Sequence, residues 1–214
     1  FFSRLATMWS ALGFGGGEEK EAEQPTNSEM RSVKLEQKFE KMSVKETFDL
    51  MFSKELIIGY QESQGNKDVE VSDWKEITTD EDKASSVTRW ERTLKYTVPM
   101  NVPLPKMMAD SMGMVDTIAV NTETATLKDG VYTVTATCEL TGPPMCNKVD
   151  IKPTFTVMAA PEDPATGFVV IDIQFSFNVW GLATMVESTM ESGVQKGFSD
   201  LLATAVKMAS EKKA

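Results

Sequence analysis

Hydrophobic and polar residues alternate with a period of two over most of the middle of the chain, which is the pattern of strands with one buried face. Within residues 167–179, Val169, Ile171 and Ile173 share one face, whereas Asp172 and Gln174 share the other. The same alternation predicts seven strands, at residues 32–42, 67–74, 86–98, 115–127, 130–141, 149–158 and 167–179.

Two short sequences predict turns between these strands. Asp129-Gly130 lies between two of them and predicts a two-residue hairpin, because both central residues of a type I′ turn need positive φ. The run APEDPATG at residues 160–167 combines proline, glycine and polar residues, and it predicts a second turn.

Helical spacing follows the first strand and returns near the end of the chain. Ser43 and Glu46 have the spacing of a capping box, which predicts a short helix there and a second one over SKELIIGY. After Trp180-Gly181, apolar residues recur every three or four positions for about 30 residues, which predicts a C-terminal helix about 45 Å long. Gly193 and Gly197 lie on or near its apolar stripe, so we expect close packing or room for a ligand there.

The N-terminal segment differs from the rest of the chain. Residues 1–14 form a predicted amphipathic arm, and residues 15–31 form a predicted flexible acidic linker to a domain at 32–214. An arm this short has no core, so its apolar side chains need another surface: its own domain, a membrane interface or a groove on a partner protein. The candidate contact residues are Phe1, Phe2, Leu5, Met8, Trp9, Leu12 and Phe14.

Composition indicates one globular domain and excludes some classes of partner. Hydrophobic residues make up 41% and charged residues 25% of the 214 residues, as in ordinary globular proteins. The 22 Lys and Arg residues against 32 Asp and Glu residues give a net charge of -10, which repels phosphate backbones and argues against nucleic acid as a partner. No apolar run approaches the roughly 20 residues of a transmembrane helix.

The chain contains no histidine, which excludes Ser-His-Asp and Cys-His nucleophilic sites and His-ligated zinc. The acidic clusters at 18–19 and 80–82 lie in predicted polar loops, without the apolar setting that raises a carboxyl pKa for acid–base catalysis. Cys138 and Cys146 are expected to be free thiols, with a disulfide across a hairpin as the alternative. We therefore expect no catalytic residues, no metal site and no enzymatic activity.

The predicted order of a strand, two short helices, six strands and a long helix is that of an α+β helix-grip fold. An antiparallel sheet of about seven strands then curves round the C-terminal helix, and the space between them is either packed solid or left as an apolar cavity. The inward face of 130–141 narrows to Ala136 and Cys138, which is consistent with a cavity. From the alternation, the candidate ligand-binding residues are Leu94, Tyr96, Val134, Ala136, Phe155, Ile173, Phe175, Met190, Val194 and Phe198.

Four large residues have two interpretations each. Trp74, Trp90 and Trp180 could stack on a ligand, but aromatic residues in strands belong more often to the core. Arg92 shares a strand face with Trp90, where a charge either pairs within the protein or meets a polar group of a ligand. We favour the core for the tryptophans and a structural ion pair for Arg92.

Several segments resemble the VASt family, the START-like module of GRAM-domain sterol-transfer proteins. They are FEKMSVKETFDLMFSKE, DVEVSDW, the proline-rich run from Arg92 to Lys106, and Trp180-Gly181-Leu182, in the family's order. The resemblance covers most of residues 32–210, and it implies a START-like domain that encloses a sterol without being an enzyme. It also implies a mobile loop over the mouth of the cavity at residues 98–107, with the lid residues Pro99, Met100, Pro103 and Pro105.

The first hypothesis is therefore non-enzymatic binding, and in a further step transfer, of a hydrophobic ligand between the sheet and the C-terminal helix. No cofactor is required, and the expected occupant is a sterol, lipid or pigment. The alternative is a non-catalytic peripheral or linker subunit of a large organellar membrane complex, such as a plastid photosystem–antenna assembly, docked through residues 1–14. The sequence does not identify the organelle. We expect a peripheral protein at an organelle membrane, with a plastid thylakoid and an endoplasmic reticulum contact site as the candidates.

Overall fold

The computed structural model describes residues 31–99, 115–142, 149–177 and 183–212. The strands are β1 (Arg31–Phe39), β2 (Lys67–Val71), β3 (Lys75–Glu76), β4 (Thr88–Val98), β5 (Thr117–Lys128), β6 (Val131–Thr141), β7 (Val149–Ala160) and β8 (Asp163–Phe177). The helices are α2 (Val44–Met51), α3 (Lys54–Ser63), α4 (Asp80–Ala84) and α6 (Ala183–Glu211). Apart from the short β3 and α4, these elements follow the predicted order.

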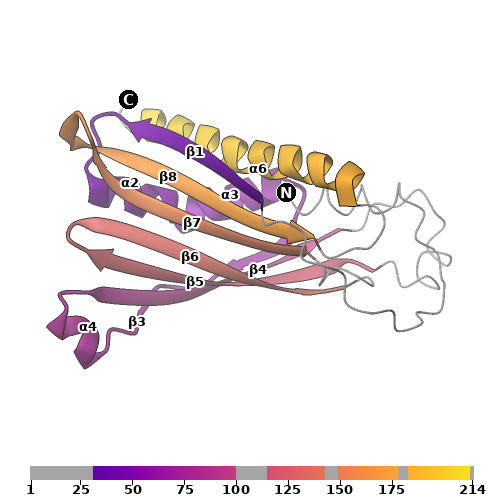
Figure 1. Ribbon diagram of the computed structural model, residues 1–214, viewed down its shortest axis with the longest axis horizontal. Helices are drawn as coiled ribbons and strands as arrows, with labels where there is room; N and C mark the ends of the chain where they lie inside the picture. The colour runs from indigo at the N-terminus through magenta and orange to yellow at the C-terminus, as the bar shows by residue number, and fades with distance from the viewer. Residues whose placement is uncertain (1–30, 100–114, 143–148, 178–182, 213–214) are drawn as a thin grey trace.

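All eight strands belong to one antiparallel sheet, whose order is β1-β8-β7-β6-β5-β4-β2, with β3 also paired to β4. The first strand joins the sheet beside the last one, so that Arg31 lies opposite Phe175 and Phe39 opposite Gly167. Helix α6 packs along β1 and against α3, which in turn contacts β2, while α2 packs on β7 and β8 (Figure 1). The helices thus connect the two edges of the sheet, and the predicted α+β helix-grip fold is confirmed.

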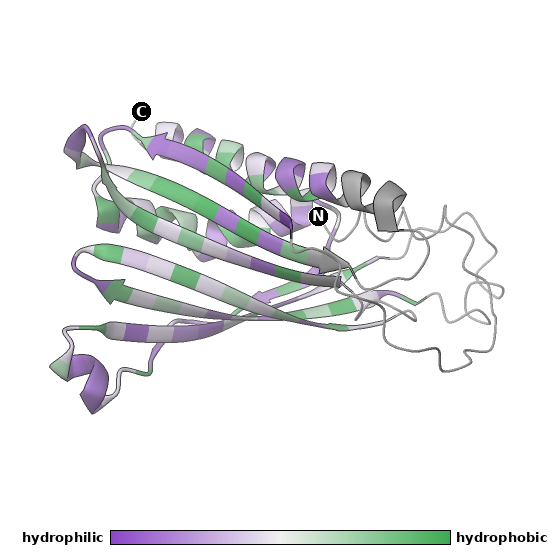
Figure 2. Cartoon of the chain, viewed as in Figure 1, coloured by the Kyte–Doolittle hydropathy of each residue, from purple (hydrophilic) through white to green (hydrophobic). Residues whose placement is uncertain are grey.

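Alternation along the strands buries one face of the sheet under these helices. Val169, Ile171 and Ile173 of β8 are fully buried, and each such side chain contributes about 1.5–3 kcal/mol when removed from water. Asp172 and Gln174 point to the solvent side. Figure 2 shows the resulting green apolar positions along β7 and β8, interrupted by polar ones.

Two local signals in the sequence form the structures they predict. The hydroxyl of Ser43 accepts a hydrogen bond from the Glu46 N–H at 3.3 Å, and the Glu46 carboxylate accepts one from the Ser43 N–H at 2.7 Å. This capping box begins α2, because it satisfies two backbone donors that the first turn leaves free. Asp129 and Gly130 have φ values of 50° and 78°, which give the predicted hairpin between β5 and β6.

The predicted turn at 160–167 is too long. Strand β7 continues to Ala160 and β8 begins at Asp163, so only Pro161 and Glu162 connect them. The Asp163 carboxylate accepts hydrogen bonds from the Ala165 N–H at 3.0 Å and from the Thr166 hydroxyl at 2.5 Å. The composition of this segment indicates a loop, but these bonds satisfy its polar groups within the start of β8.

The segment 80–84 is helix α4 rather than a loop. Its N-cap is Thr79, whose hydroxyl accepts a hydrogen bond from the Asp82 N–H at 3.2 Å, and Asp82 returns a capping-box bond. Asp82 also forms an ion pair with Arg89, with Nε and Oδ1 2.8 Å apart. The bond from the Arg89 guanidinium lowers the pKa of this carboxyl, so Asp82 has a structural partner that the polar-loop interpretation did not include.

Several predicted features lie outside the described residues. They are the arm 1–14, the linker 15–31 except for Arg31, Trp180, Cys146 and the lid beyond Pro99. These features stay predictions. In the described part of the chain, no helix is long and apolar enough to span a membrane.

Candidate functional site

A mainly apolar cavity of about 130 Å³ lies between the sheet and helices α3 and α6. The sheet supplies Leu94, Tyr96, Asn121, Glu123, Ala136, Cys138, Ile151, Pro153 and Phe155. The segment of α2 and α3 supplies Met51, Phe52, Ile57, Tyr60 and Gln61, and α6 supplies Gly197, Phe198 and Leu201. The volume is close to that of an engineered apolar cavity of about 150 Å³ that binds benzene.

The cavity exists where the inward side chains of β6 become small. Val134 is fully buried in the core, but the next two inward residues, Ala136 and Cys138, line the cavity. Across the strand pair, Ala136 lies opposite Glu123 and Cys138 opposite Asn121. A pair made of one small and one polar residue fills less of the space under α6 than the apolar pairs nearer the β5–β6 hairpin.

The ten candidate ligand-binding residues divide into three groups. Five line the cavity: Leu94, Tyr96, Ala136, Phe155 and Phe198. Four are packed in the hydrophobic core instead: Val134, Ile173, Phe175 and Val194. The side chain of Met190 lies outside the described part of the structure. Ligand contact stays a prediction for all ten.

The alternation did not identify the wall contributed by α2 and α3. The sequence predicts a second short helix that includes Ile57 and Tyr60, but nothing in their spacing shows that they face β4 and α6. The alternation also does not predict Asn121 and Glu123 as cavity residues, because polar residues on a strand are typical of the solvent face. Their positions, two apart and in phase with the buried Ala119 and Ala125, were the available signal.

Gly197 brings α3 and α6 together at one side of the cavity. The Tyr60 hydroxyl donates a hydrogen bond to the Gly197 carbonyl oxygen at 2.8 Å, and both residues are buried. With no side chain at position 197, the phenol ring reaches the helix backbone directly. The expectation of close packing or ligand space on this stripe is confirmed at Gly197, which accepts this bond and lines the cavity.

Behind the cavity wall, Arg92 forms a buried ion pair with Glu123, with Nε and Oε2 2.6 Å apart and side chains 1% and 11% exposed. Its Nη1 donates to the Phe52 carbonyl oxygen at 2.6 Å, and its guanidinium carbon lies 4.3 Å from the centre of the Trp74 ring. Its Nη2 is buried without a hydrogen-bond partner. Arg92 is therefore paired within the protein, as expected, and Trp74 packs on that pair.

Burial shapes the acid–base properties of the cavity wall. It raises the pKa of the Cys138 thiol to about 12, so this residue is a neutral thiol at physiological pH. Burial also raises the pKa values of Tyr60 and Tyr96 well above the ordinary value of 10.0. Cys138 is a free cysteine, and among the described residues no group of three His, Cys, Asp or Glu side chains could hold a metal ion.

Comparison with solved structures identifies relatives of the fold. The Zhui aromatase/cyclase of Streptomyces sp. R1128 matches with a TM-score of 0.53 and 11% identity, over 86% of this chain and 96% of that one. The norcoclaurine synthase of Thalictrum flavum matches with a TM-score of 0.45 and 12% identity, over 89% and 100% of the two chains. At such low identities the likeness concerns the fold alone.

Sequence comparison gives the family. No curated protein matches the chain. The family model described as the VAD1 Analog of StAR-related lipid transfer domain matches residues 34–193, which run from β1 into α6 and include most of the cavity wall. The chain therefore belongs to the VASt family, as the sequence segments predicted.

Proposed function

We propose that this VASt domain binds a hydrophobic small molecule, such as a sterol or another lipid, in the cavity between the sheet and α6. The observation that carries the proposal is the mainly apolar space next to Ala136 and Cys138. Cavities of this kind are favourable for apolar ligands because ligand binding removes apolar surface from water on both sides.

The size of the cavity restricts the proposal. Sites for drug-sized ligands have volumes of roughly 300–1,000 Å³, and about 130 Å³ is well below that range. A sterol therefore requires the cavity to widen, for example by separation of α3 from α6 where Tyr60 contacts Gly197. A small ring compound or the end of a lipid chain needs no such change.

We propose binding, with transfer between membranes as its use, rather than catalysis. Two polar groups of the cavity wall are engaged with the protein: Tyr60 with Gly197, and Glu123 with Arg92. The raised pKa of Cys138 keeps its thiol protonated, so it does not supply a thiolate nucleophile. These features support a site that holds a ligand, although two of the structural neighbours are enzymes with the same fold.

Filling the cavity tests the proposal. Ala136→Phe places a ring in the open space and should abolish binding of an apolar fluorescent probe and of any lipid retained through purification. Thr137→Phe is the matched control, because Thr137 is the next residue of β6 and is exposed on the other face of the sheet. The measurements are probe titration and native mass spectrometry, with circular dichroism as a check on folding. Unchanged binding by a folded Ala136→Phe variant would count against this cavity as the site.

A further inference from the structure

We infer that the cavity selects ligands that carry a neutral hydrogen-bond donor, such as a hydroxyl group, over ligands that end in a carboxylate. The inference rests on the proposed function and names the class of ligand that the same site would take. The group that makes the selection is the carboxylate of Glu123, which Arg92 holds at the wall of the cavity.

Glu123 is an unusual residue for an apolar wall. It lies on the inward face of β5, between Asn121 and Ala125, and its side chain is 11% exposed. The residue opposite it on β6 is Ala136, whose small side chain leaves the space beside Glu123 open. Burying a charged carboxylate costs free energy unless it is paired. Any ligand that fills the cavity lies beside this carboxylate.

At Glu123 the cavity wall offers acceptor capacity. A carboxylate accepts through about four lone-pair positions, and the Nε of Arg92 uses one of them on Oε2. The Tyr60 hydroxyl, a donor on the same wall, is already engaged because it donates to the Gly197 carbonyl oxygen. A ligand hydroxyl can therefore donate to Glu123, and hydrogen bonds to a charged acceptor are stronger than neutral ones.

A ligand carboxylate meets the opposite situation. It would place a second negative charge next to Glu123 in a mainly apolar site, and like charges in such a site disfavour binding. Arg92 is not free to turn towards the ligand, because its Nη1 is bonded to the Phe52 carbonyl and its plane lies over Trp74. The Arg92 guanidinium is not among the groups that line the cavity, so it is not available to pair with a ligand carboxylate.

The burial of the Arg92 guanidinium allows us to predict the effect of neutralising Glu123. The Nη2 atom of Arg92 is buried and has no hydrogen-bond partner, so Glu123 is the group that balances this buried charge. Glu123→Gln keeps an oxygen that can accept from Nε but leaves the guanidinium as the uncompensated charge of the site. The preference against a carboxylate should then disappear or reverse.

Three probes of similar length test the inference on the whole chain: 1-nonanol, methyl octyl ether and nonanoate. Dissociation constants are measured by NMR titration at pH 7.5. We expect the alcohol to bind at least tenfold more tightly than the ether, which lacks a donor, and than the acid anion, which is repelled. In Glu123→Gln the alcohol-to-acid ratio of affinities should fall at least tenfold.

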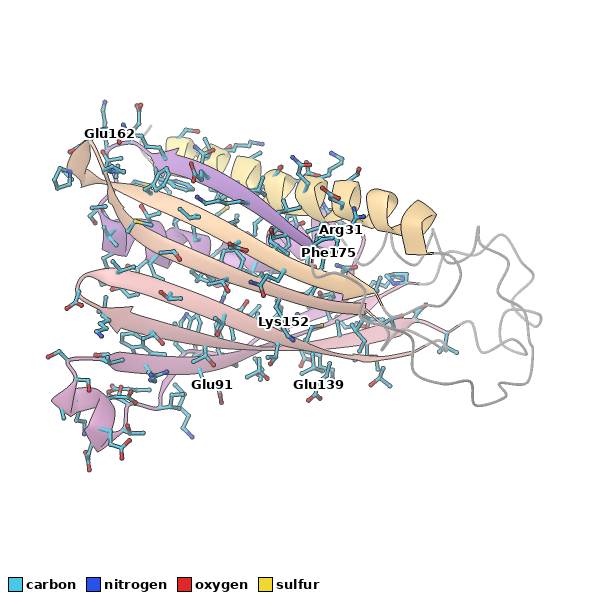
Figure 3. All side chains as sticks on the ribbon, in the orientation of Figure 1. Arg31, Glu91, Glu139, Lys152, Glu162 and Phe175 are labelled. Atoms are coloured by element: carbon cyan, nitrogen blue, oxygen red, sulfur yellow. The ribbon has the colours of Figure 1, made fainter. Side chains whose placement is uncertain are left out.

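The control variant is Glu139→Gln, which makes the same change of charge on the exposed face of β6. Figure 3 shows Glu139 projecting from the sheet on the side away from α6. This variant should leave the alcohol-to-acid ratio within twofold of the wild type. An equal drop in both variants would mean that overall charge, and not Glu123, determines the preference, and the inference would be overturned.

The remaining outcomes separate the inference from the proposed function. If all three probes bind the wild type with similar affinity, the inference is wrong and the proposed function stands. If none binds and Ala136→Phe behaves like the wild type with an apolar probe, the proposed function fails, and the inference with it. Should Glu123→Gln fail to fold, the comparison of the three probes on the wild type decides.

Discussion

The guanidinium of Arg92 contacts three parts of the fold at once. It binds Glu123 on β5, the carbonyl of Phe52 at the end of α2, and the ring of Trp74 between β2 and β3. A lysine could not replace these contacts, because only the planar guanidinium both stacks on a ring and donates in two fixed directions. Arg92 therefore links β5, the end of α2 and the β2–β3 connection on this side of the cavity.

Arg92→Met should lower the free energy of unfolding by about 3–5 kcal/mol, because it leaves Glu123 buried without its partner. Urea denaturation measures the loss. Arg89→Met is the matched control: it breaks a pair with Asp82 in which Arg89 is 43% exposed, and its effect should be much smaller. Equal losses in the two variants would contradict the role given to burial.

Stability should also fall at alkaline pH. Burial raises the pKa of Cys138 to about 12 and raises the pKa values of Tyr60 and Tyr96 from 10.0. Because the unfolded chain releases these protons at lower pH than the folded chain, their contribution is complete below about pH 9 and is lost as the pH rises further. Denaturant unfolding between pH 7 and 11 tests this, and Tyr96→Phe should show a shallower decline. An identical decline in that variant would exclude Tyr96 as a source.

The single residues also show how far sequence reasoning reaches. Alternation correctly placed Val134 and Ala136 on the same inward face of β6. Alternation does not show that Val134 is fully buried in the core while Ala136 lines a cavity. A period of two tells which face of the sheet a residue is on, but not which helix residues cover it at that point of the strand. Those helix residues are distant in the sequence.

At the scale of elements, the backbone just before α2 is hydrogen-bonded to β8. The Gly167 N–H donates to the Met42 carbonyl oxygen at 2.6 Å, just before the capping box that begins α2. The side chain of Thr47 lies against Gly167, where its hydroxyl is buried without a hydrogen-bond partner. Only a glycine leaves room for this contact.

Gly167→Ala should destabilise the fold by about 1–3 kcal/mol, because its Cβ would lie 2.8 Å from the Cβ of Thr47 and even nearer its hydroxyl. Gly59→Ala in α3 is the comparison: nothing lies within 4 Å of its Cβ, and alanine should stabilise that helix by up to about 1 kcal/mol. Thermal unfolding measures both. Thr47→Ala removes the hydroxyl but keeps the Cβ, so it should restore part of the stability of Gly167→Ala. No recovery at all in the double variant would contradict the steric explanation.

The sequence predicts the elements in which apolar residues recur with a regular period, and it does not predict α4 and β3, which have no such period. Helix α6 and the long strands have many repeats of one pattern, which averages out local exceptions. Helix α4 has five residues, none of them buried, so no apolar stripe marks it, and its capping box was the available signal. The sequence does not predict the start of β8 at Asp163, because proline and glycine there indicate a turn. The pairing with β7 is irregular at this point, since Gly167 lies opposite Ala159 and Asp163 opposite Ala160.

At the scale of the whole molecule, the helix-grip arrangement followed from the order of elements, but the cavity did not. Its α3 wall and its polar residues Asn121 and Glu123 depend on how α3, α6 and β5 meet, and no short window of sequence contains that information. The fold is thus largely readable from local patterns, whereas the site requires the assembled tertiary structure.

The pairing of β1 with β8 also sets the timing of folding during synthesis. The ribosome releases β1 first, but the strand it pairs with and the helix it packs against emerge last. Contacts between segments so far apart in sequence form slowly, and the chain exposes unpaired strand edges until they do. Both β8 and α6 must therefore be synthesised before this domain can close, and we expect a chain truncated before β8 to be a substrate for chaperones and proteases.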